Sequence, residues 1–434
     1  MKEIAVLTDF LEFNTQYGLV PAAMNQLITL REHGYDPKLI VVEGTENPKL
    51  NPNLNELPEG IQLKPVVPFM HLFDYQLGTK LQEYDVSPIG EHGPPTKTNF
   101  HKQVKLAEEM LEPELQRYDI IIEHDILYQT WKLPYNQAIR NIGKKHPHIK
   151  WVHWCHSAPS PRPHELIYPH ILRFTPMTNS IWVTMNEAMR QGFALQYNTS
   201  VENVKVVYHA VDYPTHKKFH PLSTEIWYKH QLWKPEIIVV AVSRFDHARA
   251  KGMFDVAETV NELKKLTSVQ LIYVNSWSNT EDAKKVISNL KQIIPDAIFT
   301  SEFGKQYEKG VPHEVVSNLY DVSNIHIMAS QSETFSFTMV EAALGKNLLL
   351  INEDLKPLPE VMPHARMAGF GSDWGGIRTD RKDQPNKPLY LYDRVKELYE
   401  EYKSNKALLA HRYAIRTYSP EAVWERQYKP LIED

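Results

Sequence analysis

Short apolar runs recur along the chain and alternate with longer amphipathic stretches. The first run, residues 4–7, precedes a stretch with apolar residues at Leu19, Ala23, Leu27 and Leu30, the spacing of one helix face. Further segments of strand length, each rich in apolar residues, lie at 38–42, 118–123, 150–155, 180–185, 236–243, 269–274, 325–329 and 347–352. Runs without polar alternation are typical of parallel strands that helices cover on both faces. The pattern therefore predicts an α/β fold built from βαβ units.

The length of the chain predicts two domains. The protein has 434 residues, 42% of them hydrophobic, which is enough for two separate cores. Residues 204–212 close the first half, and residues 213–234, with prolines and a short helical stretch, are interpreted as a linker. We expect a first domain over residues 1–215 and a second over residues 216–414. Residues 44–100 are rich in Pro, Asn, Glu and His, which predicts long loops with strand fragments.

Charge and cysteine content restrict the class of protein. The net charge is −5, so no overall basic field draws the chain to nucleic acid or anionic lipid, although a local basic groove is compatible with it. Cys155 is the single cysteine, which excludes a disulfide within the chain and fits a reducing compartment. No apolar run reaches the roughly 18 residues of a membrane span, and residues 1–7 read as a strand rather than a signal peptide. We expect a cytoplasmic protein.

The segment Ser332–Glu341 is the strongest candidate for chemistry. It follows the apolar run 325–329 and leads into a helical stretch, so it predicts a strand, a tight turn and a helix start. Glu333 lies at the turn, and Glu341 lies about two helical turns further on. Backbone N–H groups at a helix start attract anions, phosphates above all. We therefore expect an anion site formed by the N–H groups of Ser336, Phe337 and Thr338.

A second candidate group is cationic. Arg244 follows the apolar run 236–243, and Lys251 precedes Gly252 at the start of the next helical stretch. Fixed Arg and Lys donors stabilise an anionic ligand, above all one that gains negative charge during a reaction. Each such charge-assisted contact contributes roughly 1.5–3 kcal/mol. Arg249, between the two, is a competing candidate for the same role.

These motifs resemble those of retaining GT-B glycosyltransferases of the family-four type, a group with phage-type DNA-modifying relatives. The shared signature runs from Glu333 through Phe335 to Glu341 and continues in Pro359-Glu360, with Ser336 where the family has glycine. The resemblance implies two Rossmann-like domains that face each other across a cleft, with residues 415–434 returning to the first. It also implies a metal-independent enzyme without a cofactor, and the chain has no Asp-x-Asp motif.

The resemblance further assigns roles to residues. Glu341 would accept hydrogen bonds from the donor ribose, Glu333 would contact the donor hexose, and His156, at the end of the run 150–155, would steady the sugar. Arg244 and Lys251 would bind the diphosphate. The remaining donor-side residues would be Gly18, Ser243, Arg249, Phe303, Phe335, Ser336, Phe337 and Thr338. The implied reaction moves a hexose or pentose from a UDP- or GDP-sugar to an acceptor hydroxyl, with attack on the face that the diphosphate leaves.

Several alternatives stay open. The acceptor is a sugar, a lipid-linked glycan, a small metabolite or a hydroxymethylated pyrimidine in DNA. The DNA alternative needs basic and aromatic side chains around a flipped base, for which the candidates are Lys144, Lys145, Lys150, Trp151, Trp154 and Arg162. A non-catalytic nucleotide-sugar-binding protein and a sugar-nucleotide epimerase are the other classes. A dehydrogenase is not expected because the G-x-G-x-x-G fingerprint is absent.

Two alternatives for the chemistry of the chain involve histidine: a zinc site and a thiolate nucleophile. His146, His148, His153 and His156 lie close in sequence but lack the usual spacings of zinc ligands. Cys155 beside His156 would make a thiolate pair, but adjacent residues of a strand point to opposite faces. Neither alternative is favoured.

Overall fold

The protein is described here by a computed structural model that covers residues 2–8, 19–43, 63–67, 99–128, 133–156, 167–333, 336–374, 377–379 and 387–433. The chain forms two compact units. The first unit comprises Met1–Val211 and Pro420–Asp434, and the second comprises Asp212–Ser419. The sequence led us to expect boundaries at 215 and 415.

The first unit is a parallel sheet of seven strands in the order β3-β2-β1-β4-β5-β6-β7. Its strands are β1 (Ile4–Thr8), β2 (Lys38–Glu43), β3 (Leu63–Val67), β4 (Ile120–His124), β5 (Lys150–Trp154), β6 (Ser180–Thr184) and β7 (Val204–Val206). Its helices are α1 (Leu19–Glu32), α2 (Phe100–Leu115), α3 (Leu133–Lys145), α4 (Glu187–Gln196), α14 (Pro420–Val423) and α15 (Lys429–Glu433), with a π-helical turn at Trp424–Tyr428.

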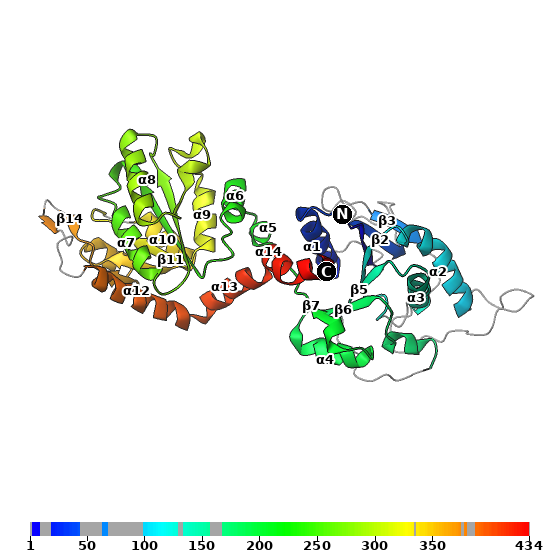
Figure 1. Ribbon diagram of the computed structural model, residues 1–434. Helices are drawn as coiled ribbons and strands as arrows, with labels where there is room; N and C mark the ends of the chain where they lie inside the picture. The colour runs from blue at the N-terminus through cyan, green and yellow to red at the C-terminus, as the bar shows by residue number, and fades with distance from the viewer. Residues whose placement is uncertain are drawn as a thin grey trace, which may run out of the picture. The chain divides into compact units, whose positions relative to one another are not determined.

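Both faces of this sheet are buried, as the uninterrupted apolar runs predict. On one face, α1 and the C-terminal segment pack over residues such as Val6, Val41 and Ile122. On the other face, α2, α3 and α4 cover the alternate positions. The red C-terminal helices lie beside the blue helix α1 in Figure 1. The chain end is therefore part of the first core.

The second unit is a parallel sheet of six strands in the order β10-β9-β8-β11-β12-β13. These strands are β8 (Ile237–Arg244), β9 (Val269–Ser276), β10 (Ile298–Phe299), β11 (Ile325–Met328), β12 (Leu348–Asn352) and β13 (Arg366–Ala368). A two-stranded antiparallel sheet, β14 (Ser372–Trp374) with β15 (Ile377–Thr379), follows. The helices are α5 (Tyr213–Lys217), α6 (Pro221–Lys229), α7 (Met253–Leu263), α8 (Glu281–Ile293), α9 (His313–Val322), α10 (Phe337–Leu344), α11 (Pro357–Val361), α12 (Lys387–Ser404) and α13 (Lys406–Tyr418).

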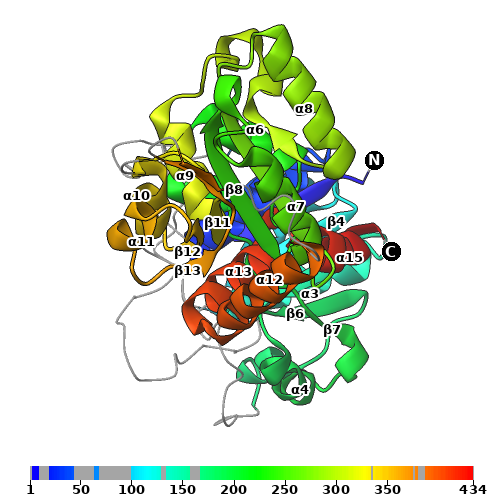
Figure 2. The ribbon, with the colours of Figure 1, turned by 90° about the vertical axis from the view of Figure 1, so that its left-hand side faces the viewer.

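Helices cover both faces of this second sheet as well. Figure 2 shows α7 and α8 on one side of β8 and β11, and α9, α10 and α11 on the other. Helix α12 joins α7 and α8 in the core of the first of these faces. Two doubly wound parallel sheets confirm the predicted α/β fold class of two Rossmann-like domains.

One part of the second unit differs from expectation. Residues 213–234, interpreted as a linker, form α5 and α6, and the Tyr213 hydroxyl of α5 lies 3.3 Å from the Asp321 carbonyl oxygen and 2.9 Å from His411 Nε2 of the same unit. The region after 361 contains β13 and the β14–β15 pair. Within the described residues, no helix combines the length and the apolar character that crossing a membrane needs.

Candidate functional site

The strand order of the second unit marks one place at its carboxyl edge. From β8 the chain proceeds outward to β9 and β10, then crosses back to pair β11 with β8 on the other side. Open parallel sheets bind ligands at such a switch point, beyond the carboxyl ends of the strands. Arg244 is the last residue of β8, and Ala329 and Ser330 follow β11 directly. Both candidate motifs of this unit therefore converge on one edge.

Lys251 and Glu333 are brought together at this edge. The Lys251 Nζ donates to Glu333 Oε1 at 2.6 Å and lies 3.3 Å from the Ser332 carbonyl oxygen. Ser330 Oγ donates to the same Glu333 oxygen at 3.2 Å. The amide of Gln331 donates to the Ala250 carbonyl at 2.8 Å, which joins the two segments by their backbones. The pair is thus fixed by main-chain contacts as well as by charge.

Gly252 makes this close approach possible. Its φ is +67°, and a Cβ built on it would lie 2.0 Å from the Ala329 carbonyl oxygen. Only glycine fits both the left-handed backbone and the missing space. The Lys-Gly order read from the sequence therefore has a steric reason.

Arg244 lies in an exposed position beside two groups that the sequence did not single out. Its Nη2 and Nε donate to the Asp246 carboxylate at 2.6 and 3.2 Å. These hydrogen bonds lower the pKa of Asp246 and raise that of Arg244. Its guanidinium carbon lies 5.5 Å from the ring centroid of Trp277. Arg244 is therefore held as a cation with a defined direction.

The start of α10 is built as the sequence predicts. Ser336 is the N-cap, and its Oγ accepts from the Met339 N–H at 3.4 Å. Ser336 is buried, whereas the Phe337 side chain is 73% exposed. Further along the helix, Glu341 Oε1 lies 2.9 Å from His313 Nε2 of α9. A hollow of about 230 Å³ adjoins this pair.

The other donor-side residues have mixed surroundings. Ser243 Oγ donates to the Arg244 carbonyl oxygen at 3.3 Å. The guanidinium carbon of the exposed Arg249 lies 5.8 Å from the centroid of the Phe254 ring. Phe303 is half-buried, with Lys229 Nζ 4.5 Å from its ring centroid and His230 at its edge. Gly18 and Phe335 lie outside the described residues.

In the first unit, His156 belongs to a hydrogen-bonded row. Its Nε2 lies 2.7 Å from His124 Nδ1, and His124 Nε2 lies 2.9 Å from Gln26 Oε1. Gln26 Nε2 in turn donates to Tyr428 OH at 3.1 Å. His209 stacks on the His156 ring with centroids 5.1 Å apart. The row links the sheet edge to the C-terminal segment.

Burial keeps these histidines uncharged. Desolvation, followed by the neighbouring His209, lowers the pKa of His156 to about 3. Desolvation also lowers the pKa of His124 and of His209. At neutral pH the row therefore consists of neutral rings, which bind by hydrogen bonding and not by charge.

The residues of the histidine and cysteine alternatives, neither of which is favoured by the sequence, have other partners or are buried. His146 pairs with Glu112 at 2.8 Å, and His153 Nδ1 pairs with Glu123 at 2.9 Å. The described residues contain no group of three or more His, Cys, Asp or Glu placed to bind a metal ion. Cys155 is buried, and burial raises the pKa of its thiol well above the ordinary value. A thiolate nucleophile is therefore not formed there.

The DNA alternative also loses its aromatic groups. Trp151 and Trp154 are fully buried on β5, because a strand inside a parallel sheet is covered on both faces. Lys145 pairs with Glu108 and Glu112, and Lys150 donates to the Leu431 carbonyl at 2.9 Å. Arg162 lies outside the described residues. Neither tryptophan is placed to stack on a flipped base.

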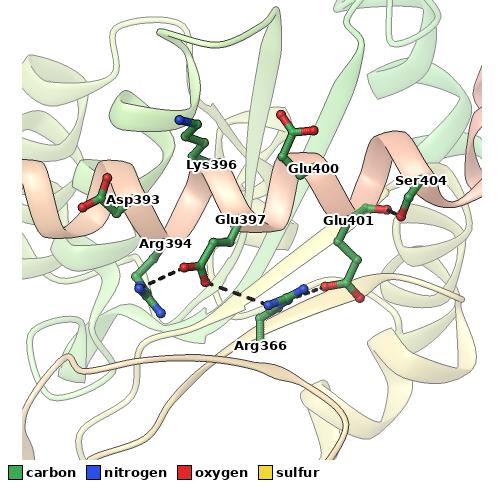
Figure 3. A pocket seen from close by; sticks show the side chains of 8 residues that line it. All are labelled: Arg366, Asp393, Arg394, Lys396, Glu397, Glu400, Glu401 and Ser404. Atoms are coloured by element: carbon green, nitrogen blue, oxygen red, sulfur yellow. Dashed lines mark hydrogen bonds and ion pairs between the residues drawn. The ribbon is translucent and has the colours of Figure 1, made fainter.

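A charged hollow of about 640 Å³ lies on the other edge of the second sheet. Arg366, its central cation, is the first residue of β13, whereas Arg244 is the last of β8. In Figure 3, Glu397 and Glu401 of α12 point toward Arg366, and Lys396 and Glu400 point the other way. Arg366 Nε donates to Glu401 Oε2 at 2.5 Å. This hollow is an exposed ion-pair network away from the switch point.

Comparisons with known proteins find structural similarity, and only at low sequence identity. No protein-family model and no curated protein match this chain. The N-terminal domain of Candida albicans trehalose-6-phosphate phosphatase matches 98% of this chain and 95% of its own, at 14% identity and a TM-score of 0.36. The structure of Anabaena Alr3699/HepE in complex with UDP-glucose matches 100% of this chain and 100% of its own, at 12% identity and a TM-score of 0.34.

A UDP-forming α,α-trehalose-phosphate synthase from Burkholderia xenovorans matches 98% of this chain and 97% of its own. The identity is 13% and the TM-score 0.36. Because these TM-scores lie below 0.5, the architecture of this chain rests on its own strand order and contacts.

Proposed function

We propose that this chain is a glycosyltransferase that takes its sugar from a nucleotide-diphospho-sugar. The observation that carries the proposal is the convergence of Arg244, the Lys251–Glu333 pair and the N-terminus of α10 on the switch point of the second unit. Two cations beside a helix start match a diphosphate. A carboxylate fixed among them matches a hydroxyl-bearing sugar.

The proposed chemistry needs stabilisation of charge more than a nucleophile. The acceptor oxygen forms a bond to the sugar C1 while the bond from C1 to the phosphate oxygen breaks, and the acceptor proton passes to that phosphate oxygen. Arg244 and Lys251 stabilise the charge that grows on the diphosphate. No described residue at this edge is placed as an enzyme nucleophile, which favours attack on the face that the diphosphate leaves.

The two glutamates take separate roles in the proposal. Glu333 is oriented by Lys251 and Ser330 and accepts hydrogen bonds from hydroxyls of the donor sugar. Glu341, two helical turns into α10, accepts hydrogen bonds from the ribose, in exchange for its contact with His313. The donor is of the UDP or GDP type, and the transferred sugar is a hexose or a pentose. The reaction requires no metal ion or cofactor.

The proposal also gives a role to His156 of the first unit, which is uncharged: it steadies the transferred sugar. Gly18, which the sequence led us to expect on the donor side, lies outside the described residues. The acceptor is a hydroxyl-bearing molecule. The burial of Trp151 and Trp154 weakens the case for DNA, so saccharides and small metabolites are the first acceptors to test.

Calorimetric titration with UDP, GDP and ADP tests the proposal. The wild-type protein should bind one of the three, and Arg244→Ala should weaken that binding by about 10- to 150-fold. Arg366→Ala is the matched control, because it removes an exposed arginine from the other edge of the same sheet. Arg249→Ala decides whether Arg249 shares the diphosphate.

Transfer assays with the matching sugar nucleotides then separate an enzyme from a binding protein. Release of the nucleoside diphosphate that depends on an acceptor supports transfer. A folded wild-type protein that binds none of the three nucleotides would refute the donor site.

A further inference from the structure

Trp277 is an unusual residue at the carboxyl edge of the second sheet. It follows β9 directly, its φ is +56°, and its side chain is 48% exposed. A bulky residue rarely adopts a left-handed backbone, and such strain persists where the surroundings enforce it. The exposed indole therefore calls for an explanation other than packing.

A buried polar network enforces this conformation. Asn275 Nδ2 donates to Ser278 Oγ at 2.6 Å and to Ser301 Oγ at 2.8 Å. The Ser278 N–H donates to the Glu308 carbonyl at 2.7 Å. Asn275 and Ser278 are both buried, so the short segment that contains Trp277 is fixed at both ends while Trp277 itself is 48% exposed.

The position of the ring relative to Arg244 suggests what it binds. Ser276, the residue before Trp277, pairs with Arg244 in the β8–β9 register. The Arg244 guanidinium carbon lies 5.5 Å from the centroid of the Trp277 ring, and Trp277 is 48% exposed, so a cation and an exposed indole lie side by side. A cation beside a flat ring complements a ligand that joins an anionic group to an aromatic one. A nucleoside diphosphate has this composition.

Phe303, another aromatic residue expected on the donor side, already contacts two side chains. Lys229 Nζ lies 4.5 Å from its ring centroid, and the His230 ring meets it at 5.7 Å. Trp277 is more exposed than Phe303, and it lies beside Arg244, the proposed ligand of the diphosphate.

We propose that Trp277 stacks on the base of the donor nucleotide, while Arg244 binds the diphosphate of the same molecule. This inference rests on the proposed function and adds the group that recognises the base. Base–aromatic stacking is tolerant of base identity because every base has a π-face. The stack therefore contributes affinity for any base. A preference for purines or pyrimidines would come from the space beside the ring and not from the stacking itself.

The experiment compares nucleotides with a probe that lacks the base. UDP, GDP and inorganic pyrophosphate are titrated calorimetrically into the wild-type protein, Trp277→Leu, Trp277→Phe and Trp277→Asn. Leucine removes the aromatic face, and phenylalanine retains it. Asparagine tolerates a left-handed backbone better than tryptophan, so that variant should melt at or above the wild-type temperature. Tyr413→Leu is the control, an exposed aromatic residue on α13.

Trp277→Leu and Trp277→Asn should weaken nucleotide binding by about 5- to 150-fold, the range of one stacked base. Their affinity for pyrophosphate should stay near the wild-type value, and Trp277→Phe should retain most of the nucleotide affinity. Unchanged nucleotide affinity in Trp277→Leu would overturn the inference, as would an equal loss for nucleotide and pyrophosphate. Wild-type protein that binds neither probe would overturn the proposed function itself.

Discussion

Replacement of Gly252 by alanine tests the contact on which the candidate site depends. The new Cβ would lie 2.0 Å from the Ala329 oxygen, 2.5 Å from its carbonyl carbon and 2.8 Å from its Cβ. Carbon atoms in van der Waals contact are separated by about 3.5–4.0 Å. Ala329 is fully buried behind β11, and the Gln331–Ala250 hydrogen bond joins the same two segments. Neither backbone segment can therefore yield without a wider shift.

The expected loss of stability has two parts. A non-glycine residue in the left-handed region costs roughly 1–2 kcal/mol. Overpacking against a fixed backbone adds about 1–3 kcal/mol. We therefore expect Gly252→Ala to lower the free energy of unfolding by about 2–5 kcal/mol. Because Lys251 precedes this residue, binding of the donor nucleotide should fall as well.

Gly34→Ala separates the two parts. Gly34 also has a positive φ, +90°, but no heavy atom lies within 4 Å of a Cβ built there. This variant should lose only the backbone part and keep its nucleotide affinity. Denaturant-induced unfolding of both variants and the wild type gives the comparison. If Gly252→Ala were no less stable than Gly34→Ala, the packing of residues 250–252 against 329–331 would be refuted.

Two further predictions concern buried titratable groups of the first unit. The pKa of His156 is about 3 when folded against an ordinary 6.5, so the unfolded state binds more protons between these values and acid should destabilise the fold. His156→Gln should flatten the slope of unfolding free energy between pH 5 and 6.5 by up to about 1.4 kcal/mol per pH unit, and an unchanged slope would contradict the assignment. Cys155 is buried and its pKa is raised, so a thiol reagent at pH 8 should label it only after denaturant is added. Immediate labelling of the native protein would show that the thiol is accessible.

Much of the fold could be predicted from the sequence because buried parallel strands have a distinct pattern. The segment 236–243 is apolar from Ile237 to Val242, and helices cover both faces of β8. The candidate site in the second unit was predicted from Arg244 at a strand end, from Lys251-Gly252 at a helix start and from the resemblance to glycosyltransferases. The prediction was wrong at β5, where the basic neighbours of Trp151 and Trp154 suggested that these side chains could reach DNA. Both are buried, as expected for a strand inside a parallel sheet.

What the sequence could not show depends on contacts between distant residues or on backbone conformation. Gln26 and Tyr428 are 402 positions apart, and no local pattern indicates that they meet near His124. Trp277 adopts a positive φ without a glycine to signal it, because the buried Asn275 and Ser278 contacts enforce the conformation. The sequence predicts strands at 118–123 and 150–155, which are followed by His124 and His156. The two histidines meet because these strands, β4 and β5, pair in parallel, and the sequence gives no direct sign of that pairing.

The candidate residues of the two units differ in charge. The second unit presents Arg244 and Lys251, cations that match a diphosphate. The first unit presents His156, which burial keeps neutral. A protonated histidine would form a second anion site and compete with Arg244 and Lys251 for the phosphates. A neutral ring can exchange hydrogen bonds with a sugar hydroxyl without that competition. If the proposed function holds, burial of the histidine row therefore keeps His156 from acting as a second anion site.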